Sequence, residues 1–301
     1  MSIAADIAED SPGGEELRWV ADIGGSHVTA AVIEVGDQPR VIRRATGEIE
    51  PEANADEILQ SITGTLRRAA PGAGAWTIAL PGPFDYERGS GTFEGVAKFA
   101  ALANVDLRTR LSAVLGVERG DVRFVNDAVA YGVGEWSASP HRAARFVCIT
   151  LGTGVGSAFL DYGHPVESGR EVPPHGWAHL LEIEGRPLED FVSTRAIQRR
   201  YGQHRDDRRT VREIADRARR GEAHAAEILD AAMFELGTAL APWIARFGAT
   251  ETVVGGSMAR SWDVLGGPFA RAVQDVTAET VNIRASTLFD DAPLIGSAML
   301  A

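Results

Sequence analysis

Three short glycine-rich segments carry the residue types that hold phosphate groups. They are Asp22-Ile-Gly-Gly-Ser26, Leu151-Gly-Thr-Gly-Val-Gly156 and Val253-Val-Gly-Gly-Ser257. Glycine lets the backbone approach an anion closely, and consecutive N–H groups form a positively polarised hollow. One such loop is weak evidence, because glycines also serve hairpin turns for steric reasons alone. Three such loops together, with hydroxyls beside the glycines at Ser26 and Thr153 among them, favour phosphate binding.

An acidic residue, Asp22, directly precedes the first of these loops. A carboxylate beside a phosphate site is expected where Mg²⁺ lies between the two, held here through water. The usual P-loop, which ends in Gly-Lys-Ser/Thr, is absent. A dinucleotide fingerprint is also absent, because Gly24 and Gly152 fall in expected hairpin turns and do not open a helix.

Asn126 and Asp127 follow the apolar segment Val122–Val125, which is typical of a buried strand. A carboxylate in this position can accept the proton of a hydroxyl that attacks the γ-phosphate of a nucleotide. The structural alternative is a helix N-cap, a position that Asn and Asp both favour. The glycine loops elsewhere in the chain favour the catalytic interpretation for Asp127.

The elements that position these residues alternate between strands and helices. The first half predicts a hairpin, a helix and a strand ending in Pro81-Gly-Pro83, then a second helix and strand. The second half again opens with a hairpin whose turn holds glycines, followed by helices, a strand, a helix, a strand and a terminal helix. The expected strands are 18–23, 27–35, 40–44, 76–80, 122–125, 145–151, 157–161, 252–254 and 286–288; the expected helices are 53–68, 105–115, 128–135, most of 188–246, 268–280 and 294–300. This order predicts an α/β protein with two halves of similar design.

Composition narrows the possible partners of the 301-residue chain. Acidic residues outnumber basic ones 42 to 30, which gives a net charge of −12 and argues against binding to nucleic acid or to a membrane surface. The single cysteine, Cys148, lies in an apolar run, so an internal disulfide and a cysteine zinc site are both excluded. Residues 1–17 resemble a disordered lead-in and not a secretory signal. We found no apolar stretch of roughly 18 residues, and a cytoplasmic protein is expected.

The three loops, in this order, resemble the first phosphate, second phosphate and adenosine motifs of the actin/hexokinase/Hsp70 superfamily. From Trp19 to its end the chain resembles the ROK family of bacterial sugar kinases and repressors. The resemblance implies two actin-like (ribonuclease H-like) domains with a cleft between them. Residues 18–134 would form a small N-terminal domain and residues 135–289 a large C-terminal domain, with the terminal helix, 290–301, packing back on the first. A homodimer is also implied.

The resemblance assigns roles to individual residues. Asp127 matches the general base of the family's kinases, and Asp22 would hold Mg²⁺ through water. Sugar-binding residues correspond to Gly82, Asn126, His179 and Glu189. ATP-binding residues correspond to Gly24, Gly25, Ser26, Gly152, Thr153, Gly154, Gly156, Gly255, Gly256 and Ser257.

The chain departs from the family pattern at three places. The glutamate of the family's Glu-x-x-His segment falls on Gly176, where His175 or Glu182 could replace it. The family's cysteine-rich zinc segment is replaced by Glu184-Gly-Arg-Pro187, so no zinc site is expected. A sugar-contacting asparagine falls near Lys98, which is the only lysine of the chain. These departures leave the identity of the acceptor open.

The sequence therefore predicts an ATP-dependent kinase that phosphorylates a hexose-like sugar at its 6-hydroxyl, with glucose or an amino sugar such as kanosamine as the acceptor. The alternatives are a cyclitol kinase of antibiotic biosynthesis and a non-catalytic sugar-binding regulator. A regulator would be expected to carry a DNA-binding segment before residue 18 and a basic face. A polyphosphate-dependent kinase would favour a basic groove, which the net charge of −12 does not support.

Overall fold

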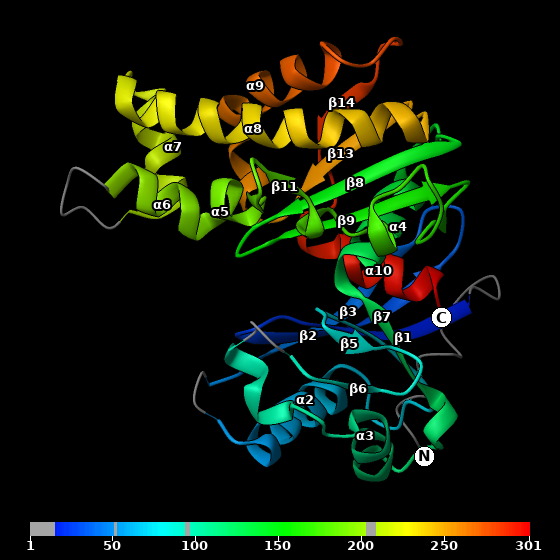
Figure 1. Cartoon of the computed structure of the whole chain (residues 1–301). Coiled ribbons are helices and arrows are strands. Elements are labelled where there is room, and N and C mark those ends of the chain that lie inside the picture. The colour runs from blue at the N-terminus through cyan, green and yellow to red at the C-terminus, as the bar shows by residue number, and fades with distance from the viewer. Residues whose placement is uncertain (1–15, 51–52, 94–96, 203–208) are drawn as a thin grey trace. The chain divides into compact units, whose positions relative to one another are not determined.

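The computed structural model of the chain (Figure 1) describes residues 16–50, 53–93, 97–202 and 209–301. It divides into two compact units. Unit 1 contains the chain up to Ala138 together with Asp291–Ala301, and unit 2 contains Ser139–Asp290. Both units are built from sheets and helices, which confirms the predicted α/β class.

Unit 1 is organised around a five-stranded sheet with the order β3-β2-β1-β4-β7. Strands β1, β2 and β3 form an antiparallel meander, whereas β4 and β7 run parallel to β1. The strands are β1 (Glu16–Ile23), β2 (His27–Val35), β3 (Arg40–Glu48), β4 (Trp76–Leu80) and β7 (Val122–Asn126). Strand β1 begins at Glu16, which pairs with Val35, so Glu16 and Leu17 belong to the sheet and not to the expected lead-in. Residues 1–15 of that lead-in lie outside the described residues.

Helices cover both faces of this sheet. On one face, Ile58, Ile62 and Leu66 of α2 pack against apolar side chains of the strands. On the other face, Leu294 and Ala298 of α10 pack against residues of β1 and β2. The helices are α2 (Ala55–Ala69), α3 (Leu107–Leu115), α4 (Asp127–Ala138) and α10 (Ala292–Met299). The short elements are β5 (Phe84–Asp85), β6 (Ser90–Gly91), η1 (Ala97–Leu102) and η2 (Arg119–Asp121).

Local sequence signals explain where these helices begin and end. Asn54 and Glu57 form a capping box at the start of α2, because each side chain accepts the backbone N–H of the other residue. The Asp106 side chain accepts the N–H of Thr109 and caps α3. Helix α3 ends at Leu115 and is followed by Gly116, whose φ of 75° lies in the left-handed region that glycine adopts without steric cost.

Unit 2 repeats the plan of unit 1 with the strand order β10-β9-β8-β13-β14. Strands β8, β13 and β14 are parallel, and β9 is antiparallel to β8. The strands are β8 (Arg145–Leu151), β9 (Val155–Asp161), β10 (His164–Pro165), β13 (Glu251–Gly255) and β14 (Asn282–Ala285). We predicted the last strand at 286–288, which is wrong: Asn282–Ala285 pairs with β13, and the Ser286 hydroxyl accepts the N–H of Phe289 at a 3₁₀ turn.

The helices of unit 2 enclose its largest apolar cluster. Long helix α8 contributes Leu229, Leu236, Leu240 and Ile244 to this cluster, and it packs along α9 (Figure 1). The helices are α5 (Glu189–Val192), α6 (Thr194–Gly202), α7 (Val211–Arg219), α8 (Ala223–Phe247) and α9 (Trp262–Gln274). The short elements are β11 (Glu182–Ile183), β12 (Arg186–Pro187), η3 (Pro174–Gly176), η4 (Ala178–Leu180), η5 (Ser257–Ser261) and η6 (Phe289–Asp291).

Helix α8 is long and apolar enough to cross a membrane when only its length and composition are considered. This is weak evidence for a membrane span, because the core helix of a globular unit passes the same test. Leu229, Leu236, Leu240 and Ile244 of α8 lie within the core of unit 2, whereas Phe234 is exposed.

Helices α4 and α10 approach each other so closely that glycine is required at the contact. A Cβ atom added to Gly296 would lie 1.7 Å from the carbonyl oxygen of Ala130, and one added to Gly134 would lie 2.0 Å from that of Ala292. Packed interiors leave no room for such an atom, so it would force the two helix backbones apart.

We expect Gly296→Ala to lower the free energy of unfolding by about 1–3 kcal/mol or more, through overpacking at this contact. Gly64→Ala is the matched control, because the added Cβ in α2 would have only an Arg68 nitrogen nearby, at 3.7 Å. Alanine there should raise stability by about 0.5–1 kcal/mol, since it restricts the unfolded chain more than glycine does. Urea denaturation followed by circular dichroism measures both changes. Equal urea midpoints for the two variants would contradict the conclusion that the contact between α4 and α10 requires glycine.

Candidate functional site

Three of the predicted segments of unit 1 meet at one edge of its sheet. Strands β1, β4 and β7 are adjacent and parallel, with Asp22 opposite Ala79 and Leu80 opposite Asn126. The carboxyl ends of parallel strands lie at the same edge, which is where open α/β sheets bind ligands. The first glycine loop, the loop containing Gly82 and the Asn126-Asp127 pair are therefore neighbours within unit 1.

The first glycine loop is a hairpin turn, as predicted. The N–H of Gly24 donates to the carbonyl oxygen of His27 at 3.0 Å, and this bond closes the turn between β1 and β2. Ser26 is exposed, so its hydroxyl is accessible to a ligand. Asp22 is half-buried at the end of β1. One carboxylate is a suitable donor set for Mg²⁺, because this ion retains most of its water and takes other ligands from substrate phosphates.

Asp127 is the first residue of α4, and its side chain is half-buried. Its Oδ1 accepts the N–H of Ala128 at 2.8 Å. Burial raises the pKa of the Asp127 carboxyl above its ordinary value, although the backbone N–H groups of Ala128 and Asp127 act in the opposite direction. Removing water from a carboxylate disfavours its charged form, so this side chain is a stronger proton acceptor than an exposed aspartate.

Asn126 uses both ends of its side chain in the fold. Its Oδ1 accepts the N–H of Val129 at 3.0 Å, so it caps α4, and its Nδ2 donates to the Tyr86 hydroxyl at 2.9 Å. The N-cap that we weighed as the structural alternative is thus present, and Asn126 provides it. An amide has a second N–H donor and a second lone pair on Oδ1, so Asn126 can make further hydrogen bonds besides these two.

Tyr86 is a site residue that the sequence analysis missed. Its hydroxyl accepts from Asn126 and donates to the carbonyl oxygen of Leu80 at 3.1 Å, at the end of the strand that precedes Gly82. A Cβ added to Gly82 would lie 3.6 Å from the same hydroxyl oxygen. The available signal was its place in the sequence, four residues after Gly82 in a loop that follows a parallel strand.

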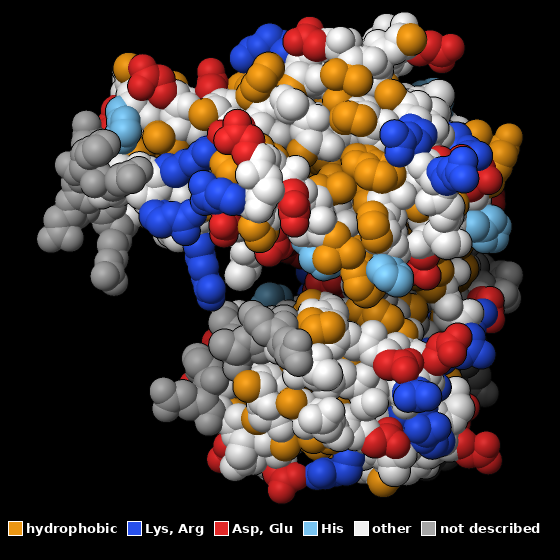
Figure 2. All heavy atoms as spheres, in the orientation of Figure 1, with side chains coloured by type: hydrophobic (Ala, Val, Ile, Leu, Met, Phe, Trp, Pro, Cys, Tyr) orange, Lys and Arg blue, Asp and Glu red, His pale blue; other side chains and the backbone are white. Residues whose placement is uncertain are grey.

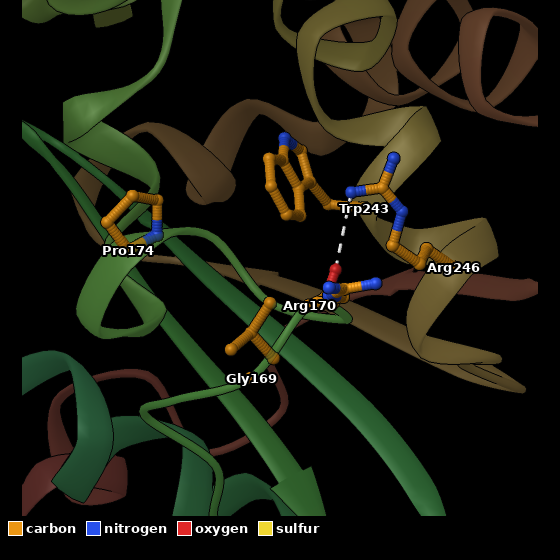
Figure 3. Close-up of a pocket in the computed structure, with 6 residues that line it drawn as sticks. Gly169, Arg170, Pro174, Trp243 and Arg246 are labelled. Carbon is orange, nitrogen blue, oxygen red and sulfur yellow. Dashed lines mark hydrogen bonds between the residues drawn. The ribbon is translucent and has the colours of Figure 1, made fainter.

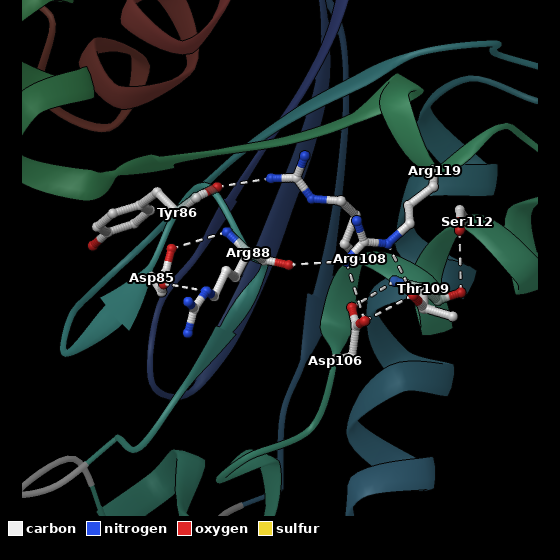
Figure 4. A network of polar contacts seen from close by, with 8 residues as sticks. All are labelled: Asp85, Tyr86, Arg88, Asp106, Arg108, Thr109, Ser112 and Arg119. Atoms are coloured by element: carbon white, nitrogen blue, oxygen red, sulfur yellow. Dashed lines mark hydrogen bonds and ion pairs between the residues drawn. The ribbon is translucent and has the colours of Figure 1, made fainter.

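A network of polar contacts holds the backbone of Tyr86 in place (Figure 4). Arg108 donates from Nη2 to the Tyr86 carbonyl oxygen at 2.7 Å. Asp85 accepts the N–H of Arg88 at 2.9 Å and thereby closes the hairpin turn between β5 and β6. Arg119 links the carbonyl of Arg88 to the carboxylate of Asp106, each at 3.2 Å. This network makes Tyr86 a fixed support for Asn126.

The second and third glycine loops lie side by side in unit 2. Strands β8 and β13 are parallel neighbours with Gly255 opposite Thr150. Gly256 has a φ of 79°, and a Cβ added to it would lie 2.4 Å from the Leu151 carbonyl oxygen, so only glycine fits. The side chains of Thr153 and Ser257 are exposed at these loops. Unit 2 therefore brings together the residues predicted for the second phosphate motif and the adenosine motif.

Glu189, predicted to bind the sugar, is tied to the second glycine loop. It is the first residue of α5, and its Oε1 accepts the N–H of Val155 at 2.8 Å. A Cβ added to Gly154 would lie 2.4 Å from the same oxygen. No local pattern predicts this contact, because the two residues are 34 positions apart in the chain.

His179 lies on η4 with an exposed side chain, and its ring stacks on Trp177 with the centroids 5.5 Å apart. Although the residue is exposed overall, atoms packed around the ring keep some water away and thereby lower the pKa of His179, and the carboxylate of Glu189 acts in the opposite direction. Ser157 fixes the preceding backbone, because its hydroxyl donates to the Gly176 carbonyl at 2.6 Å and accepts the N–H of Ala178 at 2.8 Å. His175 and Glu182, the two candidates to replace the missing glutamate, both have exposed side chains.

A hairpin of β11 and β12 occupies the segment where the family has zinc-binding cysteines. Its central residues Glu184 and Gly185 have φ values of 52° and 73°, the two positive values of a type I′ turn. Across the described ranges of the chain, no group of three or more His, Cys, Asp or Glu side chains could hold a metal ion. The side chain of Lys98 lies outside the described residues.

Unit 2 has a further hollow, of about 580 Å³, at some distance in the sequence from the glycine loops. It is lined by Gly169, Arg170, Val172, Pro174, Trp243 and Arg246 (Figure 3). The Arg246 guanidinium lies 4.8 Å from the centre of a Trp243 ring and donates to the Arg170 carbonyl at 3.3 Å. No residue predicted for the site lines this hollow.

Comparison with known proteins supports the family resemblance. The chain matches the ROK family over residues 19–301. It is 25% identical to the glucokinase of Thermotoga maritima, over 93% of this chain and 95% of that protein. It is also 25% identical to the polyphosphate glucokinase of Mycobacterium tuberculosis, over 64% of this chain and 70% of that protein.

The fold is similar to that of a ROK family glucokinase from Streptomyces griseus, solved in complex with glucose and AMPPNP. The TM-score is 0.77 at 20% identity, covering 95% of this chain and 99% of that one. This similarity confirms the predicted actin-like fold class. Because the family match spans nearly the whole chain, the protein belongs to the ROK family.

Proposed function

We propose that the protein is a sugar kinase that transfers the γ-phosphoryl group of ATP to a hydroxyl of a hexose-like sugar. The observation that carries this proposal is the half-buried carboxylate of Asp127 at the carboxyl end of β7, beside the Gly82 loop and the first glycine loop. Its raised pKa suits a group that must accept a proton. The glucokinase relatives support a sugar as the acceptor.

In the proposed reaction, the acceptor hydroxyl attacks the γ-phosphorus while its proton passes to Asp127, and ADP leaves. Asn126, supported by Tyr86, orients the sugar together with Gly82, His179 and Glu189. The residues of the three glycine loops bind the nucleotide, and the first two loops hold its phosphates with backbone N–H groups. Mg²⁺ at Asp22 would neutralise charge on the transferred phosphoryl group.

We propose the 6-hydroxyl of a hexose as the acceptor, with glucose and amino sugars such as kanosamine as the first compounds to test. The glucokinase relatives favour glucose. Glycine at position 176 removes one expected sugar contact and favours an altered acceptor, including a cyclitol. A panel of these acceptors, assayed by ADP release, separates them. A sugar that binds without any turnover would instead indicate a regulator.

We also propose that the protein is a cytoplasmic homodimer. Sedimentation would test the oligomeric state, and cell fractionation would test the location.

Polyphosphate is a second candidate for the phosphoryl donor. It is favoured by relatives named polyphosphate glucokinase. Against it, several arginines on the helices of unit 2 are paired with acids: Arg200 with Glu235, Arg217 with Glu222, and Arg219 with Asp263. Acidic side chains also lie beside the basic side chains that gather on the left of unit 2 in Figure 2. Assays with ATP and with polyphosphate at equal phosphoryl concentration decide between the donors.

Asp127→Asn should lower kcat by roughly 100-fold or more, because an amide cannot accept the hydroxyl proton. Asp56→Asn is the control, since Asp56 is an exposed residue of α2, and it should leave kcat unchanged. A pKa raised on folding means that the ionised carboxylate costs stability at neutral pH, so Asp127→Asn should not lower the melting temperature. Full turnover by Asp127→Asn would remove this residue from the mechanism.

The pH dependence of kcat offers an independent check of Asp127. Only the deprotonated carboxylate accepts a proton, so kcat should fall as the pH drops through the raised pKa of Asp127. The midpoint of this fall should lie above the ordinary aspartate value of about 3.9. The measurement is kcat at saturating sugar and ATP across a pH series, with circular dichroism to verify folding. A rate that stays constant down to about pH 4 while the protein remains folded would rule out the raised pKa.

Tyr86→Phe should raise the KM for the sugar by roughly threefold to tenfold, the equivalent of one lost hydrogen bond at about 1 kcal/mol. The phenylalanine ring keeps the packing of the tyrosine but leaves the Asn126 amide without its acceptor. Tyr162→Phe is the control, because Tyr162 lies in unit 2 with 68% of its surface exposed. An unchanged KM in Tyr86→Phe would show that Tyr86 does not support the sugar site.

A further inference from the structure

The described part of unit 2 connects the predicted sugar-binding carboxylate directly to the second glycine loop. We propose that Glu189 is a positioning residue, shared between the acceptor and the loop, which fixes the phosphate-binding loop relative to the sugar. The inference rests on the proposed kinase function and adds to it a physical coupling between the acceptor and donor sites.

The first observation is the contact between Glu189 and the turn of the β8–β9 hairpin. Oε1 of Glu189 accepts the N–H of Val155 at 2.8 Å. Gly154, next to Val155, has no side chain, and the carboxylate fills the space: a Cβ there would lie 2.4 Å from Oε1 and 3.9 Å from Oε2. The glycine at position 154 therefore makes room for Glu189 as well as for a phosphate.

The second observation is that segment 189–194, which begins with Glu189, also contacts the β8–β9 turn at its other end, at Gly152. The backbone N–H and the hydroxyl of Thr194 both donate to the Gly152 carbonyl oxygen, at 2.9 and 2.7 Å. The short helix α5 connects Glu189 to Thr194, and the N–H of Ser193 donates to the Glu189 carbonyl at 3.2 Å. Segment 189–194 thus fixes the turn at both ends.

A carboxylate has two oxygens and about four sites that accept hydrogen bonds. Oε1 is engaged by the loop, which leaves Oε2 to accept a hydroxyl of the sugar. The two oxygens belong to one planar group, so the sugar and the loop are held at a fixed separation. Misplacing reacting groups by about 1 Å can cost roughly 100-fold in rate, which is why such a shared group matters for phosphoryl transfer.

The decisive variant, Gly154→Ala, changes the second glycine loop, and its effect is measured on the affinity for the sugar. Gly74, an exposed residue that precedes β4, is the matched control. Neither Gly74 nor Gly154 has a φ in the left-handed region, so alanine suits the backbone at both positions. Gly154→Ala would displace the Glu189 carboxylate, whereas the added Cβ in Gly74→Ala has no other atom within 4 Å. Calorimetric titration with glucose and the other acceptors, without nucleotide, measures the sugar Kd of each variant.

We expect Gly154→Ala to raise the sugar Kd by roughly tenfold or more, the effect of losing a hydrogen bond to a charged group, and Gly74→Ala to leave it within about twofold. An unchanged Kd in Gly154→Ala would overturn the coupling. If the wild-type chain itself binds no sugar, the proposed function fails instead, so the two failures are distinguishable. Melting temperatures verify that both variants are folded.

Substitutions at Glu189 provide a test that does not depend on the folding of the glycine variants. Glu189→Gln keeps an oxygen for the Val155 N–H, whereas Glu189→Asp is one methylene shorter and cannot reach both partners. At saturating sugar and ATP, kcat should fall by roughly 100-fold in Glu189→Asp and much less in Glu189→Gln. A rise in the sugar KM with kcat unchanged in Glu189→Asp would reduce Glu189 to a simple binding residue and refute the positioning role.

Discussion

The parallel pairing of β1, β4 and β7 is the constraint on which the candidate site depends. Parallel strands end at the same edge of a sheet, so whatever follows each strand is brought to that edge. Here the first glycine loop, the Gly82 loop and Asp127 follow these strands. Strands β8 and β13 do the same for the second and third glycine loops in unit 2. The repeated plan thus groups the polar residues of each unit without any direct attraction between them.

Close backbone approach is the second feature that organises the molecule. Gly134 and Gly296 let α4 contact α10, Gly256 lets η5 begin against Leu151, and Gly154 gives space to a carboxylate. In each case an atom of another segment occupies the space that a side chain at the glycine would fill. These glycines are therefore required by a neighbouring segment that lies close to them. The loops that resemble phosphate motifs also contribute to packing in this way.

The sequence predicted the strands and helices around the site well, because their apolar periodicity and glycine turns are local signals. Strand β2 begins and ends where we placed it, and both hairpins carry their glycines in the turn. The last strand was placed too late, since the choice between 282–285 and 286–288 depends on pairing with β13, which is a long-range contact. In the site, Tyr86 was missed because its role comes from hydrogen bonds to Asn126 and Leu80.

By itself, the sequence determined the α/β class, the two-half plan, the family and the residue types of the site. These follow from local propensity and from motifs that are contiguous in the chain. The tertiary structure decided which side chains touch: that Asn126 both caps α4 and rests on Tyr86, that burial raises the pKa of Asp127, and that Glu189 binds the Val155 N–H. Burial and hydrogen bonding between distant segments exist only after the chain has folded, so no local pattern encodes them.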